Sequence, residues 1–160
     1  MLEELTNVMV KEKRLFEQLI NIIKEQKVAM IERDLEKMNS LSEEMEEVLF
    51  EVDKVDGERH RLFTIYKRRL GLDEDASFEE FLNKIDGEGR AIFIETMENF
   101  LFVLNELAAE LQGMKEMMRF EKSYFDFVVS LLSDSNDRSI YKGDGRSYTE
   151  PGKKVLDVRW

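Results

Sequence analysis

The sequence of 160 residues contains no cysteine, one proline and one histidine. Without cysteine the chain has no disulfide, no thiolate nucleophile and no thiolate zinc site. The di-iron carboxylate site of helical enzymes needs two Glu-x-x-His pairs. The single histidine, His60, is preceded at three residues by Gly57, so this site is excluded. We expect neither a metal nor a cofactor.

Long apolar runs and basic patches are also missing. No apolar run approaches the ~18 residues of a membrane span. The first residues, MLEELTNVMVKEKR, lack the basic-then-apolar layout of a signal peptide. With 35 acidic and 24 basic residues, the net charge of -11 repels phosphate backbones and anionic lipid. We therefore expect a cytoplasmic protein that binds neither nucleic acid nor membrane.

No motif points to catalysis. Carboxylates are plentiful, but none stands in an apolar setting that argues for a raised pKa, and we expect no buried ionisable pair. Residues 142–145, Lys-Gly-Asp-Gly, lack the glycine spacing and the following Lys-Ser or Lys-Thr of a phosphate loop. The sequence therefore predicts that the protein is not an enzyme.

A long apolar pattern runs from Arg90 to Asp134. Its positions alternate at spacings of four and three, which is typical of a heptad seam. A helix of this length, at ~1.5 Å per residue, spans roughly 65 Å and needs long helical partners. The seam residues are Phe93, Met97, Phe100, Leu104, Leu107, Leu111, Met114, Met118, Glu121, Phe125, Val128 and Leu132.

The second half of this pattern has more apolar surface than one seam requires. On an ideal helix its apolar positions cover an arc of about 200°, against roughly 100° or more for a surface helix of a bundle. Two interpretations stay open. Either this end lies between two partner helices of the same chain, or it forms an exposed groove. The additional positions are Met117, Phe120, Tyr124, Phe127 and Leu131.

The first 70 residues show the same helical periodicity in two registers. Asp34 is a good N-cap, so we expect one helix to end near Arg33 and a second to begin at Leu35, folding back as a hairpin. One continuous helix over residues 2–70 is the alternative, because no glycine or proline accompanies Asp34. Gly57 interrupts the second register and costs ~1 kcal/mol relative to alanine.

Capping signals set the remaining boundaries. Gly71 is placed as a C-terminal cap, and Ser77 with Glu80 forms a capping box before a short helix over residues 78–85. Gly87 and Gly89 then precede the last helix, which we expect to end near Leu132. The predicted fold is all-α, an elongated antiparallel bundle or coiled coil of three long helices and one short helix. We expect a bundle domain over residues 1–132 and an irregular tail over residues 133–160.

The predicted tail contains four of the eight glycines and the only proline. It is nevertheless too apolar for a purely solubilising segment. Segments of this kind order on binding a partner or dock on their own bundle. The apolar residues of the tail are Ile140, Tyr141, Tyr148, Val155, Leu156, Val158 and Trp160.

Several of these features occur in a recognisable order. They are Asp34 after the first helix, Glu58-Arg59 followed by Leu62-Phe63, the Gly71-Leu72 stop, the segment 127–132 (FVVSLL), and the tail segment 141–145 (YKGDG). This order, which covers nearly the whole chain, resembles the FlgN family of flagellar type III export chaperones.

The resemblance implies a chaperone that binds hook-associated proteins of the hook–filament junction, prevents their premature assembly and delivers them to the export gate. It implies that a client's terminal amphipathic helix lies in a groove of the last helix, and that Tyr141 docks on the cytoplasmic platform of the gate. We expect a monomer or weak homodimer. The alternative is a structural coiled-coil homodimer or adaptor without chaperone activity. The predicted groove residues are Met114, Met117, Phe120, Tyr124, Phe127 and Leu131.

Overall fold

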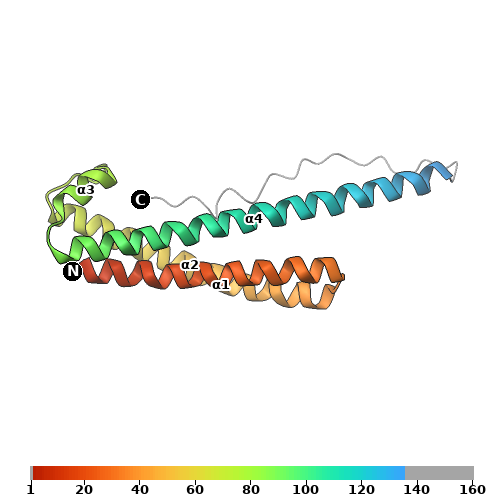
Figure 1. The fold of residues 1–160 in the computed structure, drawn as a ribbon, viewed down its shortest axis with the longest axis horizontal. Coiled ribbons are helices and arrows are strands. Elements are labelled where there is room, and N and C mark those ends of the chain that lie inside the picture. The colour runs from red at the N-terminus through yellow and green to blue at the C-terminus, as the bar shows by residue number, and fades with distance from the viewer. Residues whose placement is uncertain (1, 136–160) are drawn as a thin grey trace. The chain divides into compact units, whose positions relative to one another are not determined.

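The computed structural model describes residues 2–135, which form four helices and no strand: α1 (Leu2–Glu32), α2 (Leu35–Arg69), α3 (Phe78–Lys84) and α4 (Glu88–Ser135) (Figure 1). This confirms the predicted all-α class with three long helices and one short helix. Within residues 2–135, no helix is both long and apolar enough to cross a membrane. The structure divides after Glu110 into two units, which are described separately.

The predicted boundary between a bundle at 1–132 and a tail at 133–160 stays a prediction. Residues 133–135 continue the backbone of α4. The rest of the predicted tail, including Tyr141, lies outside the described residues.

The chain reverses between α1 and α2 at two residues. Arg33 adopts a left-handed conformation with φ 57°, and the Asp34 N–H donates to the carbonyl of Ala29 at 2.9 Å. This bond closes a Schellman motif, which ends a helix. The Asp34 carboxylate then accepts from the N–H of Lys37 at 3.0 Å and caps α2. The hairpin is confirmed, and the alternative of one continuous helix is wrong.

The ends of α2 and α3 follow from local capping chemistry. Gly71 has φ 69°, and the Leu72 N–H donates to the carbonyl of Lys67 at 2.9 Å, forming a second Schellman motif. At α3 the Ser77 hydroxyl accepts from the Glu80 N–H at 3.2 Å, and the Glu80 carboxylate accepts from the Ser77 N–H at 2.7 Å. The predicted C-cap and capping box are both confirmed.

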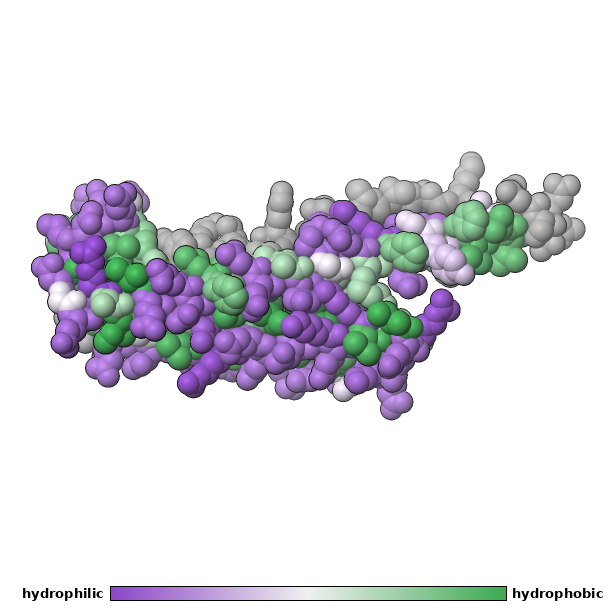
Figure 2. All heavy atoms as spheres, in the orientation of Figure 1, coloured by the Kyte–Doolittle hydropathy of each residue, from purple (hydrophilic) through white to green (hydrophobic). Residues whose placement is uncertain are grey.

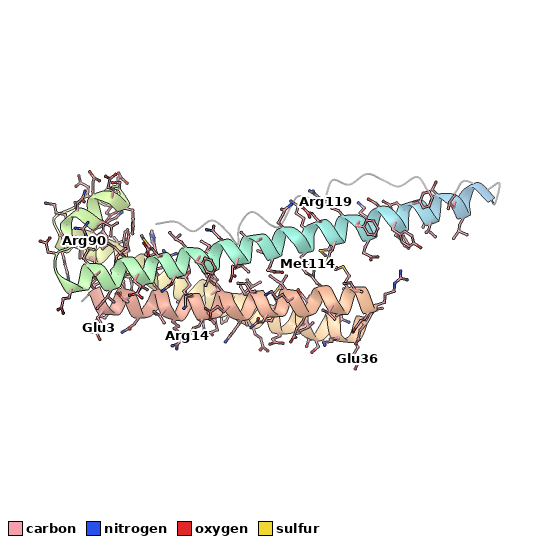
Figure 3. The ribbon with its side chains drawn as sticks, viewed as in Figure 1. Glu3, Arg14, Glu36, Arg90, Met114 and Arg119 are labelled. Atoms are coloured by element: carbon pink, nitrogen blue, oxygen red, sulfur yellow. The ribbon has the colours of Figure 1, made fainter. Side chains whose placement is uncertain are left out.

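Side-chain contacts fix α1 and α2 as antiparallel neighbours (Figure 1). At one end the Tyr66 hydroxyl donates to the Glu4 carboxylate at 3.3 Å. Toward the other end the Gln26 amide donates to the Ser42 hydroxyl at 3.5 Å. Figure 3 labels Glu3 and Glu36, which lie at opposite ends of this hairpin.

The first half of α4 runs parallel to α1. Phe16 and Phe100 have ring centroids 5.5 Å apart, and Lys27 pairs with Glu110 at 2.6 Å. The hydrogen bond from Lys27 lowers the pKa of the Glu110 carboxyl. Phe93, Phe100 and Leu107 of the predicted seam are buried here, which confirms the seam in the first half of the helix.

An aromatic cluster joins α2, α3 and the start of α4. The rings of Phe63 and Phe81 lie 4.5 Å apart, and those of Phe81 and Phe93 lie 5.8 Å apart in an edge-on arrangement. Phe81 and Phe93 are fully buried. Such aromatic pairs contribute about 0.5–1.5 kcal/mol beyond their area burial, so Phe81 helps to hold the short α3 in place.

A charged pair lies inside the packing of α1 and α2. The Arg59 Nε donates to the Glu12 carboxylate at 2.7 Å, and the two side chains are 2% and 1% exposed. Arg59 also pairs with Asp56. Burial raises the pKa of the Glu12 carboxyl to about 7, although the neighbouring guanidinium acts in the opposite direction. The expectation that no ionisable pair is buried, and that no carboxyl has a raised pKa, was wrong.

Gly57 lies in the interior of α2 on an exposed surface, and a Cβ added there meets nothing within 4 Å. We expect Gly57→Ala to raise the free energy of unfolding by about 1 kcal/mol, because alanine has the higher helix propensity. Urea denaturation measures the change. Gly71→Ala is the matched control, since the same added methyl group at φ 69° is expected to lower stability. A gain at Gly71, or none at Gly57, contradicts the prediction.

Candidate functional site

From Leu111 onward, α4 presents large apolar side chains to solvent. The helix has 48 residues, against 31 in α1 and 35 in α2. Figure 2 shows apolar side chains gathered toward the end of α4. Seven of these side chains are 51–70% exposed. Exposed apolar patches of this kind mark binding surfaces in monomeric proteins. The seven are Met118, Phe120, Tyr124, Phe125, Phe127, Leu131 and Leu132.

These side chains form two stripes along the helix. Phe120, Tyr124, Phe127 and Leu131 follow one another at spacings of four, three and four, and on an ideal helix they lie within about 60° of each other. We call this set the aromatic stripe. Met118 and Phe125 belong to a second stripe about 140° around the helix, at heptad spacing. Together the stripes account for the wide apolar arc that the sequence predicts.

The six predicted groove residues differ in exposure and in their position around the helix. Four of them make up the aromatic stripe, and Met117 adjoins it but is only half-buried rather than exposed. Met114 is also half-buried. On an ideal helix it lies about 110° from the centre of the aromatic stripe, on the side of the helix that carries the second stripe. In Figure 3 Met114 and Arg119 project from opposite sides of α4.

The exposure of this segment bears on the two interpretations of its apolar arc. Phe93 and Phe125 are both residues of the predicted seam, but the first is fully buried and the second is 65% exposed. The exposed side chains favour the interpretation of an exposed groove, which stays a prediction. Seam residues Phe93, Phe100 and Leu107 are buried, whereas seam residues Met118, Phe125 and Leu132 are exposed.

The chemistry of the segment is that of a contact surface. Between Leu111 and Leu132 the charged residues are three basic and three acidic: Lys115, Glu116, Arg119, Glu121, Lys122 and Asp126. Within residues 2–135 no group of acidic or histidine side chains is arranged to hold a metal ion. Aromatic and methionine side chains at helical spacing instead suit an amphipathic helix, and methionine adapts to varied partners.

The buried Glu12–Arg59 pair does not form a second site. Among the described residues, no buried side-chain nitrogen or oxygen lacks a hydrogen-bond partner. The buried polar atoms of both side chains therefore have hydrogen-bond partners within the protein. The pair is a feature of helix packing, and the candidate site remains the exposed part of α4.

By its structure, the described part of the chain is an all-α protein with an exposed apolar helix face and charged flanks. The model of the family described as FlgN protein matches residues 1–149, and the chain belongs to this family. FlgN proteins are flagellar export chaperones for hook-associated proteins and are not enzymes. The family, the chaperone function and the absence of enzymatic activity were thus predicted correctly. No curated protein and no solved structure matches the chain.

Proposed function

We propose that the apolar face of α4 over residues 114–131 binds the terminal amphipathic helix of a hook-associated protein. By covering the helix through which such a client assembles, the chaperone keeps the client unassembled until it reaches the export gate. The observation that carries this proposal is the exposure of the aromatic stripe on a single helix face. We infer that this takes place in the cytoplasm, where chaperones of the family act.

The composition of the aromatic stripe supports this role. Fully burying a Phe or Leu side chain contributes about 1.5–3 kcal/mol. Phe120, Tyr124 and Phe127 therefore offer three anchors in a row for a client helix. Interfaces concentrate their binding energy in a few such aromatic residues near the centre, surrounded by contacts that exclude water.

Isothermal titration tests the proposal directly. The full chain is titrated with the C-terminal helical segment of a hook–filament junction protein, and light scattering gives the mass before and after. We expect saturable one-to-one binding to a monomer or weak dimer. Absence of binding over the micromolar range contradicts the proposal.

A structural homodimer is the second candidate. Met118 and Phe125 are exposed at heptad spacing, which is the arrangement that pairs two helices in a coiled coil. This candidate predicts a constant dimer mass that the client segment leaves unchanged. A monomer, or a dimer that the client converts to a one-to-one complex, favours the chaperone.

We also propose that Tyr141 docks on the cytoplasmic platform of the export gate. Its ring supplies buried area and its hydroxyl supplies a hydrogen bond. Tyr141→Ala is expected to weaken binding to the platform by about tenfold or more, as for an interface anchor, and to reduce export of the client. Client affinity should not fall. Tyr141→Phe keeps the ring and is the matched control, with an intermediate effect expected. Weaker client binding in Tyr141→Ala contradicts the docking role.

A further inference from the structure

We infer that residues 136–160 of the same chain cover the apolar face of α4 when no client is bound, so that a client must displace them. This inference rests on the proposed function, because it concerns the regulation of the same face. It identifies the occupant of the face in the free chaperone as the chain's own C-terminal segment.

Length and position make this segment suitable. It follows Ser135, the last residue of α4, and comprises the 25 residues to Trp160. An extended chain reaches at most ~3.3–3.6 Å per residue, so 25 residues span roughly 80 Å. The face from Met114 to Leu131 occupies only about 26 Å of helix at ~1.5 Å per residue. The segment is therefore long enough to turn back and follow the whole face.

The composition of the segment matches the face. It has seven large apolar residues among its 25, and three of them are aromatic: Ile140, Tyr141, Tyr148, Val155, Leu156, Val158 and Trp160. It also differs in charge from the rest of the chain. Residues 136–160 carry six basic and four acidic residues, whereas residues 1–135 carry 18 basic and 31 acidic residues. The segment is consequently not repelled by the acidic remainder of the chain, and the face itself, with three basic and three acidic residues between Leu111 and Leu132, is electrically balanced.

Tethering makes even weak contacts effective. A segment joined directly to its binding site acts at an effective concentration in the millimolar range. Because the face is available to a client only for the fraction of time that it is uncovered, coverage for ~90% of the time lowers apparent client affinity about tenfold. Such coverage shields exposed Phe120, Phe125 and Phe127 from self-association without blocking a tightly bound client.

Trp160 is the single tryptophan of the chain and reports on the segment directly. In the free full-length protein we expect blue-shifted Trp160 emission, and a red shift when a saturating client segment, itself free of tryptophan, is added. Phe120→Ser with Phe127→Ser should produce the same red shift without client. Shielded emission that persists in this variant places the segment elsewhere and overturns the inference.

Client affinity gives an independent test in the full chain. Val155→Ser with Leu156→Ser removes apolar contacts of the segment but keeps Tyr141 and Trp160. This variant is expected to bind the client segment about fivefold to tenfold more tightly than the parent chain, because the face is uncovered more often. Ser147→Ala with Thr149→Ala changes neighbouring polar residues and is the matched control, with less than twofold change expected. Unchanged affinity in the Val155/Leu156 variant overturns the inference.

The two hypotheses fail in distinguishable ways. If client binding disappears in the Phe120/Phe127 variant but is unchanged in the Val155/Leu156 variant, the proposed function is upheld and the tail inference is overturned. A red shift in the Phe120/Phe127 variant, with no client binding to the parent chain or to the Val155/Leu156 variant, upholds the tail inference and overturns the proposed function. Shielding of Trp160 that appears only at concentrations where the mass doubles identifies a second copy as the occupant and also overturns the inference.

Discussion

Replacing Phe120 and Phe127 with alanine is expected to weaken binding of the client segment by about 4 kcal/mol, or roughly a thousandfold. Both rings are anchors in the proposed interface. In the free protein they are 70% and 60% exposed, so their removal takes little away from the fold. Alanine is also the better helix former. We therefore expect helix content and the midpoint of urea denaturation to stay close to those of the parent chain.

The chain offers a matched control for this double variant. Phe50 in α2 and Phe102 in the first half of α4 are 62% and 64% exposed, and both lie outside the proposed face. Phe50→Ala with Phe102→Ala also removes two exposed phenyl rings, and it should leave client affinity within about twofold of that of the parent chain. Titration and circular dichroism are measured on both variants. Equal losses of affinity in the two variants contradict the location of the site, and loss of helix content in the Phe120/Phe127 variant places those rings in the core.

The helix boundaries were predictable because they depend on local chemistry. An aspartate that accepts from the N–H three residues later, a glycine in the left-handed region and a serine–glutamate capping box each act within a few residues. Asp34, Gly71 and the Ser77–Glu80 pair make these contacts in the structure. Arg33 carries no such signal, although it adopts the left-handed conformation that ends α1.

Whether an apolar stripe is covered was not predictable from its periodicity. A hydrophobic pattern identifies the side of a helix that avoids water, but it does not say whether a partner lies there. Phe93 and Phe125 both belong to the predicted seam, and only the first is buried. The difference arises from what packs beside each half of the helix. The excess width of the apolar arc was the available signal that part of the apolar surface of α4 is exposed.

The buried pair was missed because each charge was considered on its own helix. Glu12 falls between Met9 and Phe16 in the buried seam of α1, and Arg59 falls between Val55 and Leu62 in that of α2. A single charge at such a position is consistent with a residue at the edge of the core. Opposite charges at seam positions of two helices that form a hairpin are a more specific pattern, and this pattern predicts a buried ion pair.

Breaking this pair is expected to have the largest effect on stability. Arg59→Met removes the cation and donor from the buried Glu12 carboxylate, and loss of one partner of a buried ion pair costs about 3–5 kcal/mol. Lys54→Met is the matched control, because its ion pair with Glu51 is exposed and contributes well under 1 kcal/mol. Urea denaturation at pH 8 compares the two variants. Similar small changes in both contradict a structural role for the buried pair.

The pH dependence gives a second, signed test of the same pair. The pKa of Glu12 is about 7 in the folded protein, against an ordinary value of 4.5. Between these values the folded state binds more protons than the unfolded state, so this group stabilises the fold most at low pH. Its contribution is lost as the pH rises through 7, by up to about 3 kcal/mol. Glu12→Gln should reduce this dependence between pH 5 and pH 8, and an unchanged slope excludes Glu12 as its source.

The same linkage predicts how Arg59→Met depends on pH and how it can be rescued. Removing the guanidinium takes away the main influence that lowers the pKa of Glu12, so the carboxyl is neutral at pH 5 and the variant is destabilised far less there than at pH 8. Glu12→Leu with Arg59→Met replaces both charges by apolar side chains. We expect this double variant to recover most of the lost stability at pH 8, because well-packed apolar residues often match or exceed a buried ion pair. A double variant as unstable as Arg59→Met alone would instead show that the cost is lost packing of the arginine side chain against Phe100, whose ring centroid lies 5.6 Å from the guanidinium carbon.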